Sequence, residues 1–399
     1  MSTPKIKFDL QIKHGSEYGA EEERAILEVL RAGAPTSGEV CFQFERDFAR
    51  YCGAAHARAV SNGTAALFLA LVALDIKRGD RVLTTPLTWI ATAAVGATLG
   101  AEVDFVDIDP VTYNLDPKQL EAKLTLNTRA VLPVHLYGQC CEMDAILAIT
   151  GKRRIAVVED ACHAVGAAYN GRKAGSMGFA GCFSFHEQKN MSTLGEGGMI
   201  ITQAPEAFER IALYRSHCTR VYGKSTKYCS LDEAKFPMGK RFWFQDFDDC
   251  GYNFRLTDIQ AAAGIVQLKK LDALNQRRID NGAYLTAGLR DVPGLTLPVV
   301  APGHKHVFHL YPVQIDPIEF GMTKDDFIYA MLYERGIKVG THYTPLHYST
   351  AFQKRGFKKG QFPVTETVME RLVTLPINPR QNHEALDYLI DSIRRLQKR

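Results

Sequence analysis

Residues 155–200 read IAVVEDACHAVGAAYNGRKAGSMGFAGCFSFHEQKNMSTLGEGGMI. The stretch opens with a β-branched apolar run that ends in two acids, Glu159 and Asp160. A glycine-rich passage follows, and then comes the segment 184–190, which contains Lys189. An apolar run of this kind predicts a strand that is buried on both faces of a sheet. Ligands bind beyond the carboxyl ends of such strands, so an acid at that end is a candidate site residue.

Strands and helices alternate around this stretch, from about residue 57 to residue 202. Runs such as VLPV at 131–134 are apolar throughout, which is typical of strands in a largely parallel sheet. The spacing is that of βαβ units. Helical patterns at 20–33 and 42–53 precede the first of these strands.

The C-terminal part of the chain has a different pattern. Thr257 can cap a long helix that ends near residue 290. Apolar residues alternate in 309–315, which predicts an antiparallel strand, and helical patterns follow at 323–335 and 380–397. We therefore expect an α/β protein with a large domain at 1–265, built on a mostly parallel central sheet flanked by helices. A smaller C-terminal α+β domain is expected at 266–399.

Composition excludes several classes of partner. The net charge of +4 is small for 399 residues, and basic residues form no long block, so neither nucleic acid nor a membrane surface is an expected partner. The N-terminus is charged throughout, unlike a signal peptide, and no apolar stretch reaches the length of a membrane span. The nine cysteines include no C-x-x-C pair, so we expect reduced thiols and a cytoplasmic protein.

Asp160 and Lys189 together predict a pyridoxal 5′-phosphate (PLP) site. PLP chemistry needs a lysine that forms a Schiff base with the aldehyde and then moves protons, and an acid that keeps the pyridine nitrogen protonated. Lys189 has apolar and glycine neighbours, whereas Lys173 lies in an exposed turn pattern and is the poorer candidate. Glu159 is the less favoured alternative to Asp160.

Other residues can hold the remaining parts of the cofactor. Gly63 and Thr64 stand between a short strand and a helix, where free backbone N–H groups and a hydroxyl can bind phosphate, and Ser184 can add a second hydroxyl. Trp89 and His163 can cover the two faces of the ring, or His163 can reach the ring hydroxyl. Each feature alone is more often structural, but the set converges on one sheet edge and favours a cofactor site.

Several motifs together resemble one family closely, namely SNGTAAL, PLTWIATA, VDIDPVTYNLDP, LPVHLYGQ, EDACHAVGA, CFSFHEQKN, TLGEGG, GYNFRLTDIQAA and HYTPLH. This is the DegT/DnrJ/StrS family of aminotransferases, the sugar aminotransferase branch of PLP-transferase fold type I. The resemblance extends from about residue 20 to about residue 395. Its most specific part is the SFHxxKN segment followed by GEGG.

The resemblance implies a role for each matching residue. Lys189 corresponds to the Schiff-base lysine and Asp160 to the acid on the pyridinium nitrogen. The ring contacts correspond to Trp89 and His163, and the phosphate contacts to Gly63, Thr64 and Ser184. Asn253, in GYNFR, corresponds to an asparagine that reaches the PLP phosphate of the neighbouring subunit. A homodimer with shared active sites is therefore implied.

The implied reaction moves an amino group from an amino-acid donor, usually glutamate or glutamine, to a keto group of a nucleotide-linked sugar. A keto-cyclitol or a non-nucleotide keto-sugar is an alternative acceptor, and a non-catalytic regulatory protein is a further alternative that the intact Lys189 and Asp160 disfavour. The chain departs from the family pattern at 35–41 and in the long segment 218–250. Basic residues in that segment can meet an acceptor phosphate or can simply be solvated, namely Arg220, Lys224, Lys227, Lys240 and Arg241.

Overall fold

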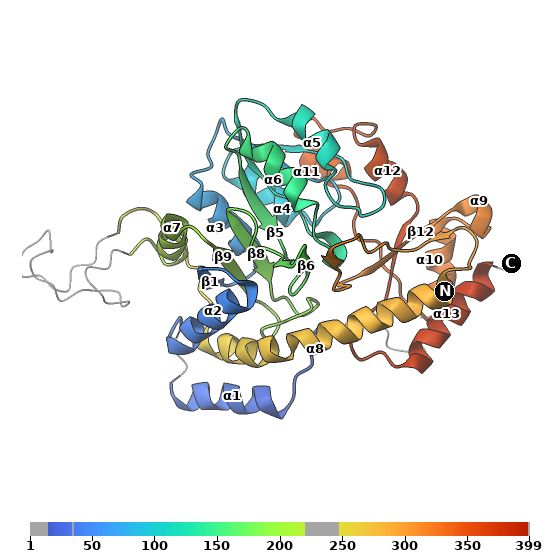
Figure 1. The fold of residues 1–399 in the computed structure, drawn as a ribbon, viewed down its shortest axis with the longest axis horizontal. Helices are drawn as coiled ribbons and strands as arrows, with labels where there is room; N and C mark the ends of the chain where they lie inside the picture. The colour runs from blue at the N-terminus through green and yellow to red at the C-terminus, as the bar shows by residue number, and fades with distance from the viewer. Residues whose placement is uncertain (1–14, 34–35, 220–246, 398–399) are drawn as a thin grey trace, which may run out of the picture.

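The computed structural model describes residues 15–33, 36–219 and 247–397. Within these residues, seven strands form a central sheet in the order β1-β9-β8-β5-β4-β2-β3 (Figure 1). The strands are β1 (His56–Val60), β2 (Arg81–Thr84), β3 (Glu102–Phe105), β4 (Thr128–Val131), β5 (Ala156–Asp160), β8 (Ala180–Ser184) and β9 (Gly198–Thr202). All neighbours pair in parallel except β9, which is antiparallel to both β1 and β8. The expected mostly parallel sheet is confirmed.

Helices cover both faces of this sheet. One face packs on α2 (Glu39–Cys52), α5 (Pro117–Lys123) and α6 (Met143–Gly151), and the other on α3 (Gly63–Ala73), α4 (Ala91–Thr98) and α7 (Pro205–Arg215). Neighbouring residues of β5 show why its sequence is apolar throughout. Val157 belongs to the core on the first face and Val158 to the core on the second, because successive side chains of a strand point to opposite faces.

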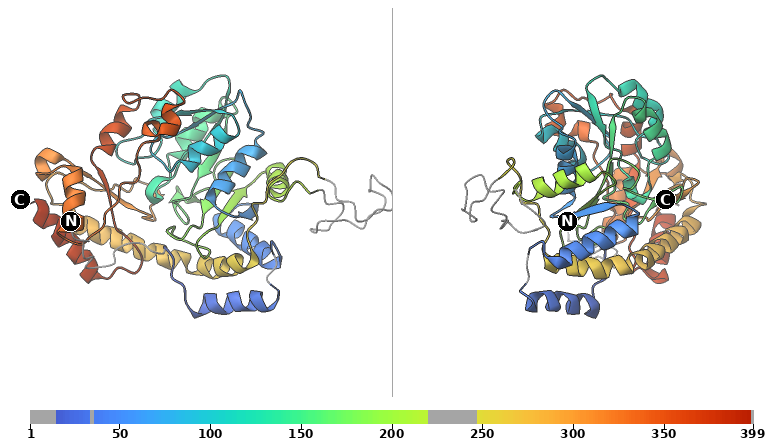
Figure 2. Two further views of the ribbon diagram at one scale, coloured as in Figure 1. Left: turned by 180° about the vertical axis from the view of Figure 1, so that it is seen from behind. Right: turned by 60° about the vertical axis from the view of Figure 1, so that its left-hand side comes forward.

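A long helix, α8 (Asp258–Leu289), connects this sheet to the C-terminal part of the chain (Figures 1 and 2). Its predicted cap is confirmed, because the Thr257 hydroxyl accepts from the Gln260 N–H in a capping box. The helix passes the predicted boundary at residue 265 without a break, and the division into domains at that residue stays a prediction. Helix α1 (Ala20–Arg31) lies against α8 on the side away from the sheet (Figure 2).

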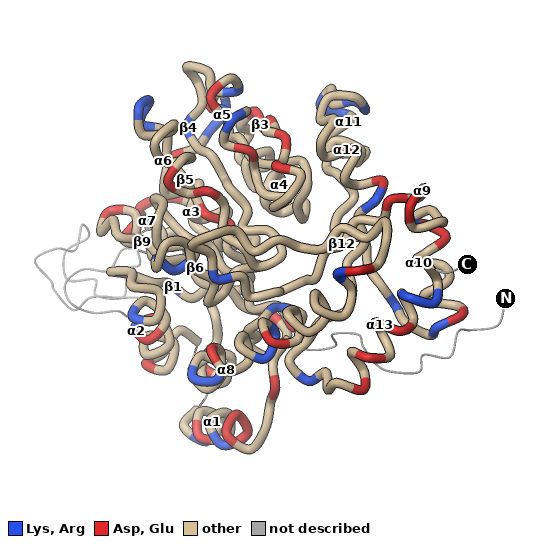
Figure 3. Tube along the Cα trace, turned by 45° about the vertical axis from the view of Figure 1, so that its right-hand side comes forward, with Lys and Arg blue, Asp and Glu red and all other residues tan. Residues whose placement is uncertain are grey.

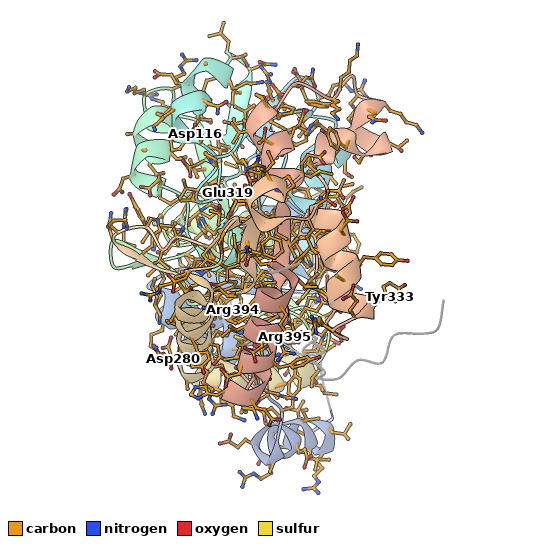
Figure 4. The ribbon with its side chains drawn as sticks, turned by 90° about the vertical axis from the view of Figure 1, so that its right-hand side faces the viewer. Asp116, Asp280, Glu319, Tyr333, Arg394 and Arg395 are labelled. Atoms are coloured by element: carbon orange, nitrogen blue, oxygen red, sulfur yellow. The ribbon has the colours of Figure 1, made fainter. Side chains whose placement is uncertain are left out.

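The C-terminal part has its own antiparallel sheet and its own core. Strand β12 (Tyr311–Ile315) pairs with β10 (Leu295–Thr296) and β13 (Leu372–Leu375). This sheet packs on α10 (Lys324–Tyr333), α13 (His383–Gln397) and the end of α8. Figure 4 shows this end of the molecule, with Arg394 and Arg395 on α13 and Tyr333 at the end of α10. Arg394 joins α13 to α8, since its guanidinium donates to the Gly288 carbonyl at 2.7 and 3.0 Å.

Shorter elements complete the described fold, namely β6 (Ala168–Tyr169), β7 (Arg172–Lys173), β11 (His304–Lys305), α9 (Pro317–Phe320), α11 (Thr350–Gln353), α12 (Pro363–Met369) and the 3₁₀ helices η1 (Leu136–Gly138) and η3 (Leu346–Tyr348). Lys and Arg are interspersed with Asp and Glu over the described helices (Figure 3). No helix in the described part of the chain has both the length and the apolar character that crossing a bilayer requires.

Candidate active site

A cavity of about 1310 Å³ lies at the edge of the central sheet where β5 and β8 end. Seven of the predicted site residues line it, namely Gly63, Thr64, Trp89, Asp160, His163, Ser184 and Lys189. Asn253 does not, although its neighbours Tyr252 and Phe254 do, and its side chain is exposed. The residues that the sequence places at the ends of separate strands therefore share one hollow.

Asp160, the last residue of β5, is held by two donors. Its Oδ2 accepts from the Thr92 hydroxyl at 2.7 Å, and its Oδ1 accepts from the Cys162 N–H at 3.1 Å. Thr92 lies on α4 and is itself buried. These donors fix the direction of the carboxylate. Such a carboxylate can bind a protonated ring nitrogen.

Glu159 points to the opposite face of the sheet, as strand alternation requires. Its oxygens accept from the backbone N–H groups of Gly175, Met177 and Gly178 at 2.6 to 2.7 Å. One of them also lies 2.8 Å from Nε2 of His135. Glu159 is thus fully occupied in holding the loop before β8, and it does not line the cavity. Of the two neighbouring acids, Asp160 is the one that faces the site.

Lys189 is half-buried in the cavity, in the turn that follows β8. Burial lowers the pKa of its ammonium, and the nearby Cys162 and Asp160 offset part of that effect. Lys173, the alternative lysine, lies on β7 instead. Its ammonium donates to the Tyr51 hydroxyl at 3.2 Å, and it is absent from the described residues that line the cavity.

The first turn of α3 faces the cavity beside Ser184. The Asn62 side chain caps the helix by accepting from the Ala65 N–H at 2.8 Å. The first backbone N–H groups of a helix have no intrahelical acceptor, so those of Gly63 and Thr64 can donate to an anion. A Cβ atom on Gly63 would lie 2.8 Å from Cβ of Ser184, and only glycine allows this close approach.

His163 and Trp89 lie on the cavity with Tyr343 near both. Nε2 of His163 is 3.1 Å from the Tyr343 hydroxyl, and the Trp89 ring is 5.9 Å from the Tyr343 ring. Nδ1 of His163 is buried without a hydrogen-bond partner among the described residues. Burial, together with the positive charge of Lys189, holds the pKa of His163 well below its usual value. A neutral imidazole with one unsatisfied nitrogen is suited to a polar group of a bound ligand.

The model of the DegT/DnrJ/EryC1/StrS aminotransferase family matches residues 16–394. The chain belongs to this family. It is 39% identical over 386 residues to the spore coat polysaccharide biosynthesis protein SpsC of Bacillus subtilis, covering 95% of each chain. Among solved structures, it is similar to S. venezuelae DesV in complex with a ketimine intermediate, with 34% identity, a TM-score of 0.85 and 95% of each chain covered. Helicobacter pylori PseC, an aminotransferase involved in the biosynthesis of pseudoaminic acid, has 27% identity and a TM-score of 0.86, with 97% of this chain and 98% of PseC covered.

This DegT/DnrJ/EryC1/StrS family member is therefore a PLP-dependent aminotransferase, and its fold is that of the PLP aminotransferases. The residues of the cavity fit the cofactor. Asp160 presents an oriented carboxylate, α3 presents free N–H groups, and His163 has an unsatisfied nitrogen. The chemistry of this donor set matches a protonated pyridine nitrogen, a phosphate and a ring hydroxyl.

Sequence reasoning missed four residues of this aminotransferase site, namely Thr92, His309, His342 and Tyr343. His342 and Tyr343 belong to the HYTPLH motif, which marks the segment but not its position in the fold. The basic residues of the 218–250 segment that were considered for the acceptor, Arg220 to Arg241, lie outside the described residues. The role of each site residue stays a proposal.

Proposed function

We propose that this aminotransferase moves an amino group from glutamate or glutamine to a keto group of a nucleotide-linked sugar. The observation that carries the proposal is the convergence of Asp160, Lys189 and the first turn of α3 on one cavity. A carboxylate, a lysine and an anion-binding helix end are the three anchors that PLP needs. The donor rests on resemblance to the family.

Bound PLP supplies an electron-accepting ring and an aldehyde that exchanges an amino group. Asp160 would hold the ring nitrogen and keep it protonated, with Thr92 fixing the direction of the carboxylate. Lys189 would hold the aldehyde carbon and move the proton at the reacting carbon of each substrate. The lowered pKa of its amine favours this proton transfer near neutral pH. Trp89 and His163 would contact the ring, and Ser184, Gly63 and Thr64 the phosphate.

The size of the cavity supports a large acceptor. Its volume of about 1310 Å³ exceeds the range of about 300–1,000 Å³ that is usual for small-molecule sites. The exposed Lys338 lines it as well. An ammonium at this position can pair with the diphosphate of a nucleotide-linked sugar. A nucleotide-linked sugar would use more of this volume and of this charge than a free keto-sugar or a keto-cyclitol.

The proposal includes a homodimer in which Asn253 serves the phosphate site of the partner subunit. Asn253 is exposed and lies off its own cavity, between two residues that line it. This placement supports a role across an interface. The test is a mixture of two inactive variants, Lys189→Met and Asn253→Asp. Mixed dimers should regain part of the activity, because one of their two sites keeps both residues, and no recovery would contradict the shared site.

The proposal also places the reaction in the cytoplasm. The eight cysteines in the described part of the chain are free thiols. Free thiols are typical of a reducing compartment, which supports this location. Fractionation of the native host, with the protein detected by antibody, would test it.

The main test follows the amino group from donor to acceptor. The purified protein is loaded with PLP, and its visible absorption is recorded before and after glutamate or glutamine is added. The band of bound PLP should disappear as the amino form of the cofactor accumulates. Lys189→Met should abolish this change, whereas the control Lys173→Met should keep it. A spectrum that no amino acid changes would contradict the donor half of the reaction.

The acceptor half is tested with the amino-loaded protein. Nucleotide-linked keto-sugars, the matching free keto-sugars and keto-cyclitols are supplied in turn, and aminated products are detected by mass spectrometry. The proposal expects an amine on a nucleotide-linked sugar. An amine found only on a free sugar or a cyclitol would replace the proposed acceptor.

A further inference from the structure

Asn190, the residue after Lys189, connects segments that are far apart in the sequence. The side chain of Asn190 is buried, and its Nδ2 donates to Oδ1 of Asn275 at 2.8 Å and to the Val307 carbonyl at 3.0 Å. Its Oδ1 lies 3.2 Å from Nδ1 of His309. All three partners are distant in sequence, so Asn190 joins the lysine turn to α8 and to the segment that enters β12.

These contacts fix the direction of each hydrogen bond. The Nδ2 of Asn190 has two acceptors, so the remaining atom, Oδ1, accepts. Nδ1 of His309 must therefore carry the hydrogen, which leaves Nε2 with a lone pair. The groups that face His309 are imidazoles and cations, namely His163, Lys189, Arg278 and His342. Burial and these neighbours hold the pKa of His309 well below its usual value, so the ring stays neutral.

The same chain of contacts reaches the segment that carries His163. Nδ2 of Asn275 donates to the carbonyl of Val165 at 2.9 Å, and Val165 follows His163 by two residues. His309 connects this network back to His163, because the centroids of the two rings are 4.3 Å apart. His309 also lines the cavity. The side chains of Asn190, Asn275 and His309 are buried, and the amide atoms of both asparagines and Nδ1 of His309 are hydrogen-bonded. Such a network holds its members in one arrangement.

We infer that His309 is a positioning residue of the reaction, whose Nδ1–H holds Asn190 and, through it, keeps Lys189 aligned with His163. This inference rests on the proposed function, because alignment matters only if Lys189 moves protons at a bound substrate. A buried amide oxygen needs a donor in any case, so the test must distinguish alignment of Lys189 from stability alone. Small displacements of a reacting group have large effects on rate.

Two variants separate the effect of the hydrogen bond to Asn190 from the effect of the imidazole ring. His309→Asn places an amide N–H close to the position of Nδ1, whereas His309→Leu removes the donor and keeps the apolar volume. We expect His309→Leu to lower kcat by about 100-fold, the loss that a misplaced catalytic group causes, with little change in the donor KM. The visible absorption of its bound PLP should titrate at a shifted pH. His309→Asn should recover most of kcat and the wild-type titration.

His306→Asn is the matched control, because His306 is buried in the same segment but does not line the cavity. It should leave kcat and the titration of bound PLP unchanged. Equal kcat and equal titration in His309→Leu and wild type would overturn the inference. So would a loss in His309→Leu that His309→Asn does not recover, since the hydrogen bond to Asn190 would then not be the cause.

A measurement on the protein without cofactor tests the same point independently of activity. In ¹⁵N-histidine NMR spectra, the signals that are present in wild type and absent from His309→Leu belong to His309. Their chemical shifts should be those of a neutral ring with its hydrogen on Nδ1. They should not change between about pH 5 and pH 8, where a free imidazole titrates. A hydrogen on Nε2, or a titrating ring, would overturn the inference. If wild-type protein binds PLP but transfers no amino group, the proposed function fails, while these spectra still decide the state of His309.

Discussion

The Thr92 hydroxyl donates a 2.7 Å hydrogen bond to Oδ2 of Asp160, so a residue of helix α4 orients the carboxylate at the end of β5. Thr92→Val keeps the volume of the side chain and removes the donor. A hydrogen bond to a charged group contributes about 1.5–3 kcal/mol, which corresponds to roughly 10- to 100-fold in an equilibrium or a rate. We expect weaker PLP binding and a lower kcat/KM by this order, measured by absorption titration and steady-state kinetics.

Thr92→Ser is the control for this prediction. Serine keeps the hydroxyl and removes only a methyl group, so PLP affinity and kcat/KM should stay close to wild type. If Thr92→Val matches wild type in both measurements, the hydrogen bond has no part in orienting Asp160.

Conversion of the neighbouring acids Asp160 and Glu159 to their amides should have different effects, one on activity and the other on stability. Asp160→Asn keeps the shape but removes the negative charge that would keep the ring nitrogen protonated, so activity should fall by at least about 100-fold with a nearly unchanged melting temperature. Glu159→Gln should mainly lower the melting temperature. Its new NH₂ group replaces one of the two oxygens and so faces either the Gly175 N–H or the N–H groups of Met177 and Gly178, which leaves buried N–H groups unpaired.

Both variants are measured by thermal unfolding and by the glutamate-dependent change in absorption. The expected pattern is one variant that is folded but inactive and one that is destabilised. An active, folded Asp160→Asn protein would remove Asp160 from the proposed site. An equally stable Glu159→Gln protein would show that the loop before β8 does not depend on this carboxylate.

The sequence predicts most strands and helices because each has a strong local signal. The apolar run of β5, the Thr257 cap and the glycine after α2 can all be read without knowledge of contacts. The same is true of residues that end strands, since parallel strands bring their ends to one edge. Thr92 could not be found in this way. It lies within a helix of small residues, and only the packing of α4 on the central sheet brings its hydroxyl to Asp160.

His309 and Tyr343 were missed for a similar reason. They come from the C-terminal third of the chain, and their distance in sequence from His163 hides the contact. No local sequence pattern predicts how the antiparallel C-terminal sheet is placed relative to the central sheet, because α8 connects the two along its whole length. The sequence therefore could not predict that these histidines surround Lys189, because only the tertiary structure brings them together.

Gly63→Ala should weaken the anion site at the start of α3. The added Cβ would lie 2.8 Å from Cβ of Ser184 and 3.0 Å from Sγ of Cys162. Real Cβ atoms essentially never come as close as the first of these distances, so the helix start or Ser184 must shift. Overpacking of this kind costs about 1–3 kcal/mol. We expect PLP affinity to fall by roughly 10- to 100-fold, measured by titrating the cofactor-free protein.

Gly151→Ala is the matched control, because a Cβ there meets no described atom within 4 Å beyond its chain neighbours and its own helix, and the residue ends helix α6. Its PLP affinity should equal that of wild type, and its stability should be equal or slightly higher since alanine favours helix. If Gly63→Ala binds PLP as tightly as Gly151→Ala, the start of α3 does not hold the phosphate.

His306 should make the protein less stable in acid. Its ring is buried, its Nδ1 accepts from the Phe308 N–H at 2.9 Å, and burial with the nearby His304 lowers its pKa to about 3. The unfolded chain binds a proton below its pKa of about 6.5, whereas the folded ring binds one only near pH 3. Stability is therefore unaffected above the unfolded pKa and falls as the pH decreases through this window.

His306→Asn tests the predicted loss of stability in acid, because an asparagine oxygen can accept from the same N–H group but does not titrate. The free energy of unfolding is measured with urea at several pH values for both proteins. The wild type should lose about 1.4 kcal/mol more than the variant for each pH unit between about 6.5 and 3. The other buried histidines contribute equally to both proteins and cancel in the difference. Parallel stability curves would show that His306 takes up its proton equally well in the folded state, and they would contradict the burial of a neutral ring.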